Sequence, residues 1–547
     1  MSGAPRRSLA PGVVLAGLLA IFALSVAARE ERFGTLEGRG HEWLTGSAVK
    51  FTRNWHREGA WALRFAMLEN PRSIEFSTLR DREPYVSYPV GCLLPIYAVS
   101  TITRREPSPA MVMSVNLAGQ LVGALAVFAL VLVALESLEL GFALRATLGA
   151  LAFMLYVFLP GPFYWLQNVY FSDQAILPFV VIAILLEVVN DQAPRPGWMR
   201  LQSWVVGLGV FTDWFMVPVA AMLLVKKLVT SDADNGGLKA RRVLFWSIPS
   251  IVALALFALQ VASLGGLASL RQKLLIRTGL AAGTAVHFSQ LADRYWGTYV
   301  RANFGGALVP AMLILATLAL LALALIRRRR DDVETRALWS GGLLLLPALL
   351  HTVVLWQHAL DHSFSPLRLL PAVAVLPFAL APTLVARRLR WTGRARAALV
   401  VILIVVGTVS LLGGRDGMSG VERARRPEIP ALGASLARLM SVGDVVFSPD
   451  FEVPTNPPEL LSYSMKRVYR LSSPESLAAR AAGLPTKARL RVVFLQEPDT
   501  SWTRAIAGKP WDDDGMVRAY DFGSAGDLAR HASRAPRVLS SSARPAG

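Results

Sequence analysis

The sequence predicts an all-α polytopic membrane bundle of about eleven transmembrane helices, followed by a small extracytoplasmic α/β domain. Three observations predict this fold class. The 547 residues are 53% hydrophobic and only 17% charged, whereas soluble domains carry about 25% charged residues. Apolar runs long enough to cross a bilayer recur until about residue 413. Beyond that residue, helix-like and strand-like patterns alternate, which is typical of a soluble α/β domain.

Nine apolar runs read directly as spans. The first follows Arg6 and Arg7 and ends in SVAAR. It resembles a cleavable signal peptide, but we expect an uncleaved helix, since later spans make a removable signal unnecessary. The nine runs are 9–28, 109–135, 146–163, 174–190, 243–262, 304–326, 337–357, 366–386 and 397–413.

The stretch 198–229 is apolar but is interrupted by Asp213. A single span would hold this carboxylate in the bilayer at about 2.5–3.5 kcal/mol. We therefore prefer a tight helical hairpin that turns at residues 212–214, with 88–103 as a helix lying on the outer face. In the alternative, 88–103 crosses the membrane and 203–225 is one span, which also totals about eleven spans.

Basic residues predict the orientation. The net charge of +19 comes largely from short clusters at 226–242, 327–330 and 386–396, and short basic loops stay cytoplasmic. This distribution indicates membrane topology and attraction to lipid headgroups rather than nucleic-acid binding. We expect an integral inner-membrane protein with a cytoplasmic N-terminus and an extracytoplasmic C-terminal domain. The single cysteine, Cys92, excludes an internal disulfide and a cysteine zinc site.

The C-terminal region carries helix patterns at 431–440 and 473–484 and strand patterns at 443–448, 468–471, 490–495 and 516–522. Residues 288–301 have the aromatic and charged spacing of an interfacial helix. The predicted organisation is an N-terminal helix at 1–28, a first extracytoplasmic loop with juxtamembrane helices at 29–108, a bundle at 109–413 with a long outer loop at 263–303, an α/β domain at 414–535 and a disordered tail at 536–547.

Four short motifs follow one another along the chain. The loop after the first helix contains His41-Glu42-Trp43 within HEWLTGSAVKFTRNW, and YVSYPVGCLLPIYAVSTI at 85–102 contains Tyr88-Pro89. YFSDQAILPF places Asp173 where the fourth span opens, and the next helical pair turns at Thr212-Asp213.

This order resembles the GT-C superfamily of glycosyltransferases, such as mannosyltransferases and aminoarabinose transferases, over residues 9–413. That family has an acid soon after the first helix, a Tyr/His-Pro-Pro helix, a second acid opening the fourth span and a Thr-Lys turn. This chain departs from it at His41, at Val90 and at Asp213.

The resemblance implies an extracytoplasmic transferase that takes a hexosyl or pentosyl group from a polyprenyl-phosphate carrier, with inversion. The acceptor is then an envelope glycolipid, polysaccharide or protein, and the partners are this donor, the acceptor and membrane lipids. Glu42 becomes the candidate base and Asp173 the second acid. Local alternatives are a role for Glu42 in capping the following helix, a role for Glu37 as the base, and an N-cap role for Asp173.

Substrate binding falls to polar residues of the outer loops. His358, Asp361 and His362 share an outer turn, and the spacing of the two histidines also suits a metal. We nevertheless expect no cofactor, with a divalent metal as the alternative. The basic residues can bind the carrier phosphate or simply attract lipid headgroups. The candidates are His41, Tyr88, Arg271, Lys273, Arg277, His358, His362 and Arg368.

Two other functions compete. A transporter or flippase for lipid-linked sugars needs ionisable residues along the bundle, and Asp213 and His351 are candidates. However, most spans carry no charge and no internal repeat is evident. A non-catalytic scaffold for envelope assembly would use the C-terminal domain for binding and would not depend on Glu42.

Overall fold

The structure is a computed structural model that describes residues 11–136, 138, 140–230, 236–281, 288–325, 332–413, 425–450, 457–471 and 473–528. The chain forms two compact units. The first comprises residues 1–67 and 85–425, and the second comprises 68–84 and 426–547. The basic residues at 6–7 and 327–330, and the predicted disordered tail, lie outside the described residues.

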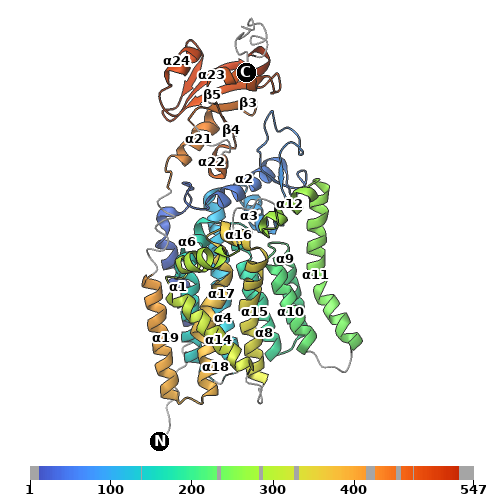
Figure 1. Ribbon diagram of the computed structural model, residues 1–547, viewed down its shortest axis with the longest axis vertical. Coiled ribbons are helices and arrows are strands. Elements are labelled where there is room, and N and C mark those ends of the chain that lie inside the picture. Colours follow the sequence, from blue (N-terminus) through green and yellow to red (C-terminus); the bar gives the residue numbers. More distant parts are fainter. Residues whose placement is uncertain are drawn as a thin grey trace, which may run out of the picture. The chain divides into compact units, whose positions relative to one another are not determined.

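The first unit is a helical bundle (Figure 1). Within the described residues, each apolar run predicted as a span is mainly helical. Helix α4 packs against α5 and α8, and α9 packs against α8 and α11. The long elements are α1 (Pro11–Ala27), α4 (Pro109–Glu136), α5 (Phe142–Phe158), α6 (Pro160–Asn168), α8 (Leu177–Gln192), α11 (Gly236–Ser263), α14 (Leu308–Leu325), α15 (Asp332–Val354), α17 (Leu370–Val375), η6 (Leu376–Leu380), α18 (Ala381–Arg388) and α19 (Gly393–Gly413).

The predicted total of eleven spans is not confirmed. Among the described residues, seven helices are long and apolar enough to cross a membrane. The α5–α6 pair, bent by 58°, makes an eighth if it counts as one span. Helix α1 has 17 residues and falls just short of that length. The polytopic membrane architecture itself is confirmed.

The predicted hairpin is confirmed. Helices α9 (Pro196–Val210) and α10 (Met216–Thr230) are joined by a turn at residues 211–215. The Phe215 N–H donates to Asp213 Oδ1 at 2.7 Å, which stabilises the turn. Residues 90–103 form η2 (Val90–Leu93) and α3 (Leu94–Thr103). At about 1.5 Å per residue they are too short to cross a core about 30 Å thick.

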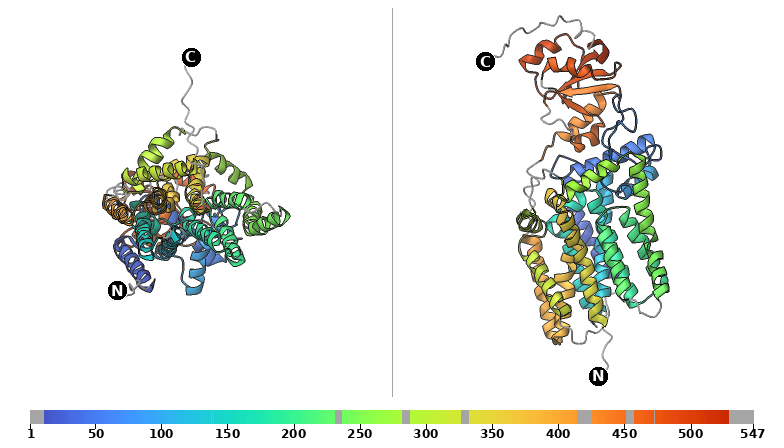
Figure 2. Two further views of the ribbon diagram at one scale, coloured as in Figure 1. Left: turned by 90° about the horizontal axis from the view of Figure 1, so that it is seen from below. Right: turned by 45° about the vertical axis from the view of Figure 1, so that its right-hand side comes forward.

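Short helices gather at one end of the bundle, as Figures 1 and 2 show for α2, α3, α12 and α16. Of the short helices in the first unit, α7, α12, α16 and η5 contain candidate site residues. The short helices include α2 (Trp43–Glu58), α7 (Ser172–Ala175), α12 (Leu267–Arg277), η4 (Leu291–Val300), α13 (Arg301–Asn303), α16 (Trp356–Asp361) and η5 (Ser365–Leu369). The helix predicted at 288–301 corresponds to η4.

The second unit contains a five-stranded sheet in the order β4-β3-β5-β7-β6. Strands β3, β4 and β5 are parallel, whereas β7 is antiparallel to both β5 and β6. Every helix and strand predicted in this region is present. The strands are β3 (Asp444–Ser448), β4 (Val468–Arg470), β5 (Arg489–Phe494), β6 (Trp511–Asp513) and β7 (Arg518–Ser524).

Helices cover both faces of this sheet. On one face, Leu477 of α23 (Pro474–Ala481) and Trp502 of α24 (Thr500–Ile506) pack with Phe447 and Val492. On the other, α21 (Ile429–Leu439) and α22 (Pro458–Ser464) pack against Val446 and Val493. Alternating residues of β3 and β5 therefore enter two separate cores, as expected for a sheet buried on both sides.

The second unit also includes a segment from the first loop, between α1 and α4. Strands β1 (Met67–Leu68) and β2 (Pro84–Tyr85) pair with each other, and the residues between them belong to the C-terminal unit. No sequence pattern predicted this excursion of the chain.

Candidate active site

Glu42 is buried at the N-cap of α2. Its Oε2 accepts the backbone N–H groups of Glu37 at 2.8 Å and Arg39 at 3.2 Å. The Arg39 guanidinium lies 3.8 Å from Oε1. These contacts hold the carboxylate in one orientation. The carboxylate of Glu37 pairs instead with Arg39 and Arg425, at 2.5 and 2.6 Å.

Asp173 lies in the single turn of α7 and is also buried. Phe171 is the N-cap of this turn, and the Asp173 carboxylate pairs with the guanidinium of Arg368 from η5. His358 of α16 lies close by, with Nε2 3.7 Å from Asp173 Oδ1. The structure therefore places Asp173 in an ion pair rather than at the cap.

His358 connects this pair to the first loop. Its Nε2 lies 3.2 Å from both Arg368 Nη2 and the Tyr88 hydroxyl. Because a guanidinium can only donate, Nε2 must accept, and the ring carries its proton on Nδ1. Burial lowers the pKa of His358 well below its ordinary value, in keeping with this neutral form.

Two more histidines lie beside His358. The ring centres of His358 and His362 are 4.4 Å apart, and those of His362 and His41 are 5.6 Å apart. His41 Nε2 contacts Ser363 Oγ at 3.1 Å. Burial lowers the pKa of His41 to about 4 and that of His362 well below its ordinary value. Near neutral pH all three rings are therefore uncharged hydrogen-bonding groups.

The side of the site that carries Glu42 is tied to the side that carries Asp173. Thr45, in the first turn of α2, donates its hydroxyl to the Asn168 carbonyl at 2.7 Å. The Thr45 hydroxyl oxygen in turn accepts the Tyr170 N–H at 2.9 Å. Residues 168–170 lead directly into α7, so these bonds fix the start of α2 against the segment that presents Asp173.

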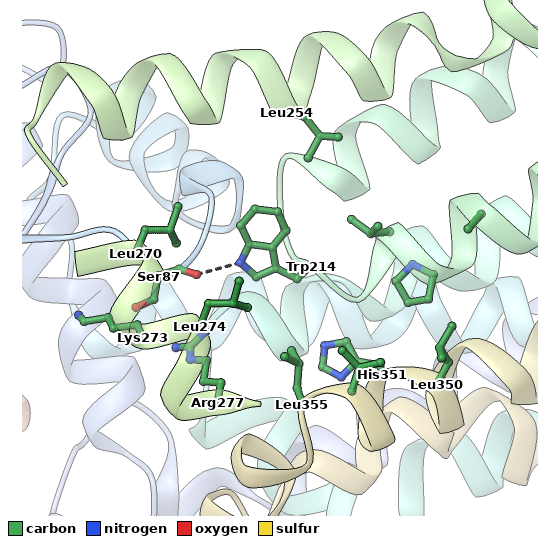
Figure 3. A pocket seen from close by; sticks show the side chains of 14 residues that line it. Ser87, Trp214, Leu254, Leu270, Lys273, Leu274, Arg277, Leu350, His351 and Leu355 are labelled. Carbon is green, nitrogen blue, oxygen red and sulfur yellow. Dashed lines mark hydrogen bonds between the residues drawn. The ribbon is translucent and has the colours of Figure 1, made fainter. Parts of the chain in front are cut away.

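A cavity of about 550 Å³ opens beside this group between α10, α11, α12 and α15. Its walls are almost entirely apolar. Figure 3 shows Lys273, Arg277 and Ser87 on one side of the cavity and His351 and Leu350 on the other. The lining residues are Ser87, Trp214, Val217, Pro218, Ala221, Leu254, Leu270, Lys273, Leu274, Arg277, Leu350, His351, Val354 and Leu355.

The basic side of the cavity is built on two tyrosines. Arg277 donates to the Tyr85 hydroxyl at 3.3 Å and lies 4.3 Å from the centre of the Tyr88 ring. Lys273 Nζ lies 4.5 Å from the centre of the Tyr85 ring. Since Tyr88 also contacts His358, it joins the basic side of the cavity to the Asp173–Arg368 pair.

The sequence candidates thus fall into groups. His358 contacts Tyr88, Asp173 and Arg368, and Arg368 pairs with Asp173. The rings of His362 and His41 adjoin this group. Lys273 lies at the cavity, whereas Arg271 is exposed on α12 and does not line it. Among the described residues, no group of three or more His, Cys, Asp or Glu side chains is arranged to hold a metal.

Sequence reasoning missed Tyr85 and Trp214. The indole N–H of Trp214 donates to the Ser87 carbonyl at 2.8 Å, which pins the first loop to the α9–α10 turn. Beside Trp214, Asp213 is fully buried, and burial raises the pKa of its carboxyl to about 6. The sequence did offer a signal for Tyr85, because a second tyrosine, Tyr88, follows three residues later. The contact of Arg277 with both tyrosines, however, is visible only in the folded structure.

No family model and no curated protein matches the chain. Solved structures do. The oligosaccharyltransferase of Archaeoglobus fulgidus in its apo form has a TM-score of 0.53 at 11% identity, covering 88% of this chain and 69% of that one. ArnT from Cupriavidus metallidurans, solved with undecaprenyl phosphate, has a TM-score of 0.47 at 14% identity, covering 93% and 97%. The chain therefore shares the fold of the oligosaccharyltransferase, in agreement with the GT-C fold that the sequence resemblance predicted.

Proposed function

We propose that this protein is an integral membrane glycosyltransferase. It moves a sugar from a polyprenyl-phosphate carrier to an envelope glycolipid, polysaccharide or protein at the extracytoplasmic face. One observation carries the proposal: an apolar cavity ends at Lys273 and Arg277, and Tyr88 and His358 link this basic end to the Asp173–Arg368 pair. The structural neighbour with the same fold is, by its name, an oligosaccharyltransferase.

The cavity suits an amphiphilic donor. Its apolar walls match a polyprenyl chain, whose burial gains about 25 cal/mol per Å². The carrier phosphate then lies against Arg277 and Lys273, since charge-assisted hydrogen bonds to phosphate are strong. The contacts with Tyr85 and Tyr88 orient both cations before the donor binds.

In the proposed reaction, the acceptor hydroxyl attacks the anomeric carbon of the donor sugar. A new carbon–oxygen bond forms to the acceptor, and the bond from that carbon to the phosphate oxygen breaks. Glu42 takes the hydroxyl proton, a role that contributes about 10²–10⁴-fold to the rate. The carrier leaves as a phosphate monoester, and Arg277 and Lys273 stabilise the charge that develops on it. Attack opposite the leaving group inverts the anomeric centre.

Asp173 holds a different role from Glu42. Its pairing with Arg368 fixes a buried cation beside neutral His358. Together with His41 and His362, this group offers hydrogen bonds to sugar hydroxyls without adding net charge. The expectation that no cofactor is needed stays a prediction, which chelation of the purified enzyme tests.

The experiment is a transfer assay on purified protein in lipid nanodiscs with a radiolabelled polyprenyl-phosphate sugar and an envelope extract as acceptor. Glu42→Gln and Asp173→Asn should each lower turnover by at least about 100-fold. Glu31→Gln, an exposed acid of the same loop, should match the wild type. Full activity in both site variants would refute the site, and no transfer by the wild type from any such donor would refute the function.

A further inference from the structure

Residues 69–83, here called the strap, leave the first extracytoplasmic loop and become part of the C-terminal domain. The Ile74 N–H donates to the Val442 carbonyl at 3.2 Å. The Ile74 side chain packs on the core that contains Phe447, Leu490 and Val492. A loop residue thus completes a hydrophobic core in which Phe447, Leu490 and Val492 lie about 370 to 420 positions later in the chain.

Two side chains of the domain hold the strap. Arg467 donates to Asn70 Oδ1 at 2.7 Å, and its guanidinium lies 5.5 Å from the centre of the Phe76 ring. The Tyr469 hydroxyl donates to the Glu75 carboxylate, with both oxygens at 3.1 Å. Arg467 immediately precedes strand β4, and Tyr469 lies within it. A rigid element therefore anchors the strap.

Both ends of the strap lead to segments that also carry candidate site residues. On the N-terminal side, the Trp55 indole N–H donates to the Ala66 carbonyl at 2.8 Å, which joins the chain before the strap to α2. On the C-terminal side, Tyr85 follows the strap through Pro84, and Ser87 and Tyr88 come next. These are the residues that hold Arg277, Trp214 and His358.

We propose that Arg467 and Tyr469 are positioning residues of the glycosyl transfer. By fixing the strap they limit the conformations of the chain that continues into Tyr85 and Tyr88, and so couple the carrier site to the anchoring of the strap. The inference rests on the proposed function. Its physical basis is that an unanchored loop samples many conformations, and misplacing a site residue by about 1 Å can cost about 100-fold in rate.

The test uses the full-length protein in nanodiscs and the double variant Arg467→Ala/Tyr469→Phe. Affinity for radiolabelled undecaprenyl phosphate is measured without acceptor, and turnover is measured separately. The variant should bind the carrier at least about 10-fold more weakly and lose at least about 10-fold in turnover. Arg489→Ala, which removes an exposed ion pair with Asp521 on the same sheet, is the matched control and should leave both values unchanged.

A rescue separates positioning from damage to the domain. In a Cys92→Ser background, Ile74→Cys and Val442→Cys are added to the double variant. A backbone hydrogen bond joins these two residues, so their chain segments are adjacent, and titration of free thiols verifies that the disulfide has formed before the assays. Oxidation should restore carrier affinity and turnover, and reduction should abolish them again.

The outcomes discriminate. If limited proteolysis shows the strap released while carrier affinity and turnover equal those of the wild type, the proposal is wrong and the proposed function stands. If oxidation forms the disulfide without restoring affinity, the proposal is also wrong. If the wild type binds the carrier but transfers no sugar, the proposed function fails, and the carrier affinities of the variants still decide the role of the strap.

Discussion

At the scale of single residues, the Asp173–Arg368 pair combines structure with chemistry. Arg368 is 2% exposed, so removing Asp173 leaves a buried cation without its partner carboxylate. Breaking a buried pair from one side costs about 3–5 kcal/mol. We expect Asp173→Asn and Arg368→Leu each to lower the free energy of unfolding by that amount, measured by denaturation in detergent.

The double variant Asp173→Asn/Arg368→Leu separates the two roles. With neither charge present, most of the lost stability should return, because the desolvation penalty disappears together with the attraction. Sugar transfer should not return, since leucine at position 368 has no hydrogen-bond donors for the sugar hydroxyls. A double variant with wild-type turnover would show that the pair is purely structural.

His41 allows a test by pH. Burial lowers the pKa of its imidazole to about 4, so the ring is neutral from about pH 5 upward. His41→Gln should therefore keep the shape of the wild-type rate profile between about pH 5 and 8 while lowering its height. The measurement is turnover across that range, and loss of an acidic limb in the variant would contradict a neutral His41.

Glu459, in α22 of the C-terminal domain, has a raised pKa, whereas that of His41 is lowered. Burial raises the pKa of its carboxyl from 4.5 to about 7, so the folded domain holds this proton more tightly than the unfolded chain does. Its contribution to stability is complete below pH 4.5 and is lost as pH rises through 7. The loss can reach about 3 kcal/mol.

Glu459→Gln should therefore stabilise the domain at pH 8 and have little effect at pH 5. Hydrogen-exchange protection of β3 and β5, corrected for intrinsic exchange, measures the difference. Glu428→Gln, an exposed acid at the start of α21, is the control and should change protection at neither pH. Equal effects of Glu459→Gln at both values would contradict the titration.

At the scale of elements, the first loop meets the α9–α10 turn at Gly91 as well as at Ser87. The Gly91 N–H donates to the Phe211 carbonyl at 3.0 Å. A Cβ added to Gly91 would lie 2.3 Å from that oxygen, and a backbone oxygen cannot move aside as a flexible side chain can. Glycine at position 91 is thus what allows η2 to lie on the turn that carries Asp213.

Gly91→Ala should lower the free energy of unfolding by about 1–3 kcal/mol, measured by thermal denaturation. It should also reduce carrier affinity, because η2 begins two residues after Tyr88. Gly119→Ala on α4 is the matched control, since nothing lies within 4 Å of its added Cβ. There the better helix propensity of alanine should leave stability equal or slightly higher. Similar losses in both variants would contradict this account.

The same scale shows what the sequence could predict. Bilayer thickness dictates the length of a span, so apolar runs were sufficient to predict a polytopic bundle, although the total of eleven spans is not confirmed. Asp213 predicted the hairpin because a carboxylate in mid-bilayer is costly. Alternation revealed β3, β5 and β7, whereas β6 escaped because Trp511, Asp512 and Asp513 are all exposed and show no apolar pattern.

The candidate site was predictable only in part. Asp173 and Tyr88 were found from motif order, and His358 and His362 from their place in an outer turn. The contacts of Arg277 with Tyr85 and Tyr88, and of Arg467 with Asn70, join residues about two to four hundred positions apart. No local periodicity encodes such pairs, because they exist only when distant elements pack together.

At the scale of the whole molecule, sidedness decides between the two topologies that the sequence allowed. If 88–103 stays on the outer face and α9–α10 is a hairpin, residue 195 is cytoplasmic; if 88–103 crosses, residue 195 is outside. The fourteen residues of η2 and α3 favour the first topology because they are too short to span. The basic residues Arg145, Arg195 and Arg200 favour it as well.

Single cysteines at exposed positions test this orientation in spheroplasts, in a Cys92→Ser background. Trp61, 84% exposed in the first loop, and Asp513 in β6 are predicted to be outside, so Trp61→Cys and Asp513→Cys should react with a membrane-impermeant thiol reagent. Arg195→Cys should react only after the membrane is opened. Labelling of all three in intact spheroplasts would establish the other topology. In that topology Asp173 lies on the cytoplasmic side of the membrane and Glu42 on the outer side. The two carboxylates could then not act in one extracytoplasmic reaction.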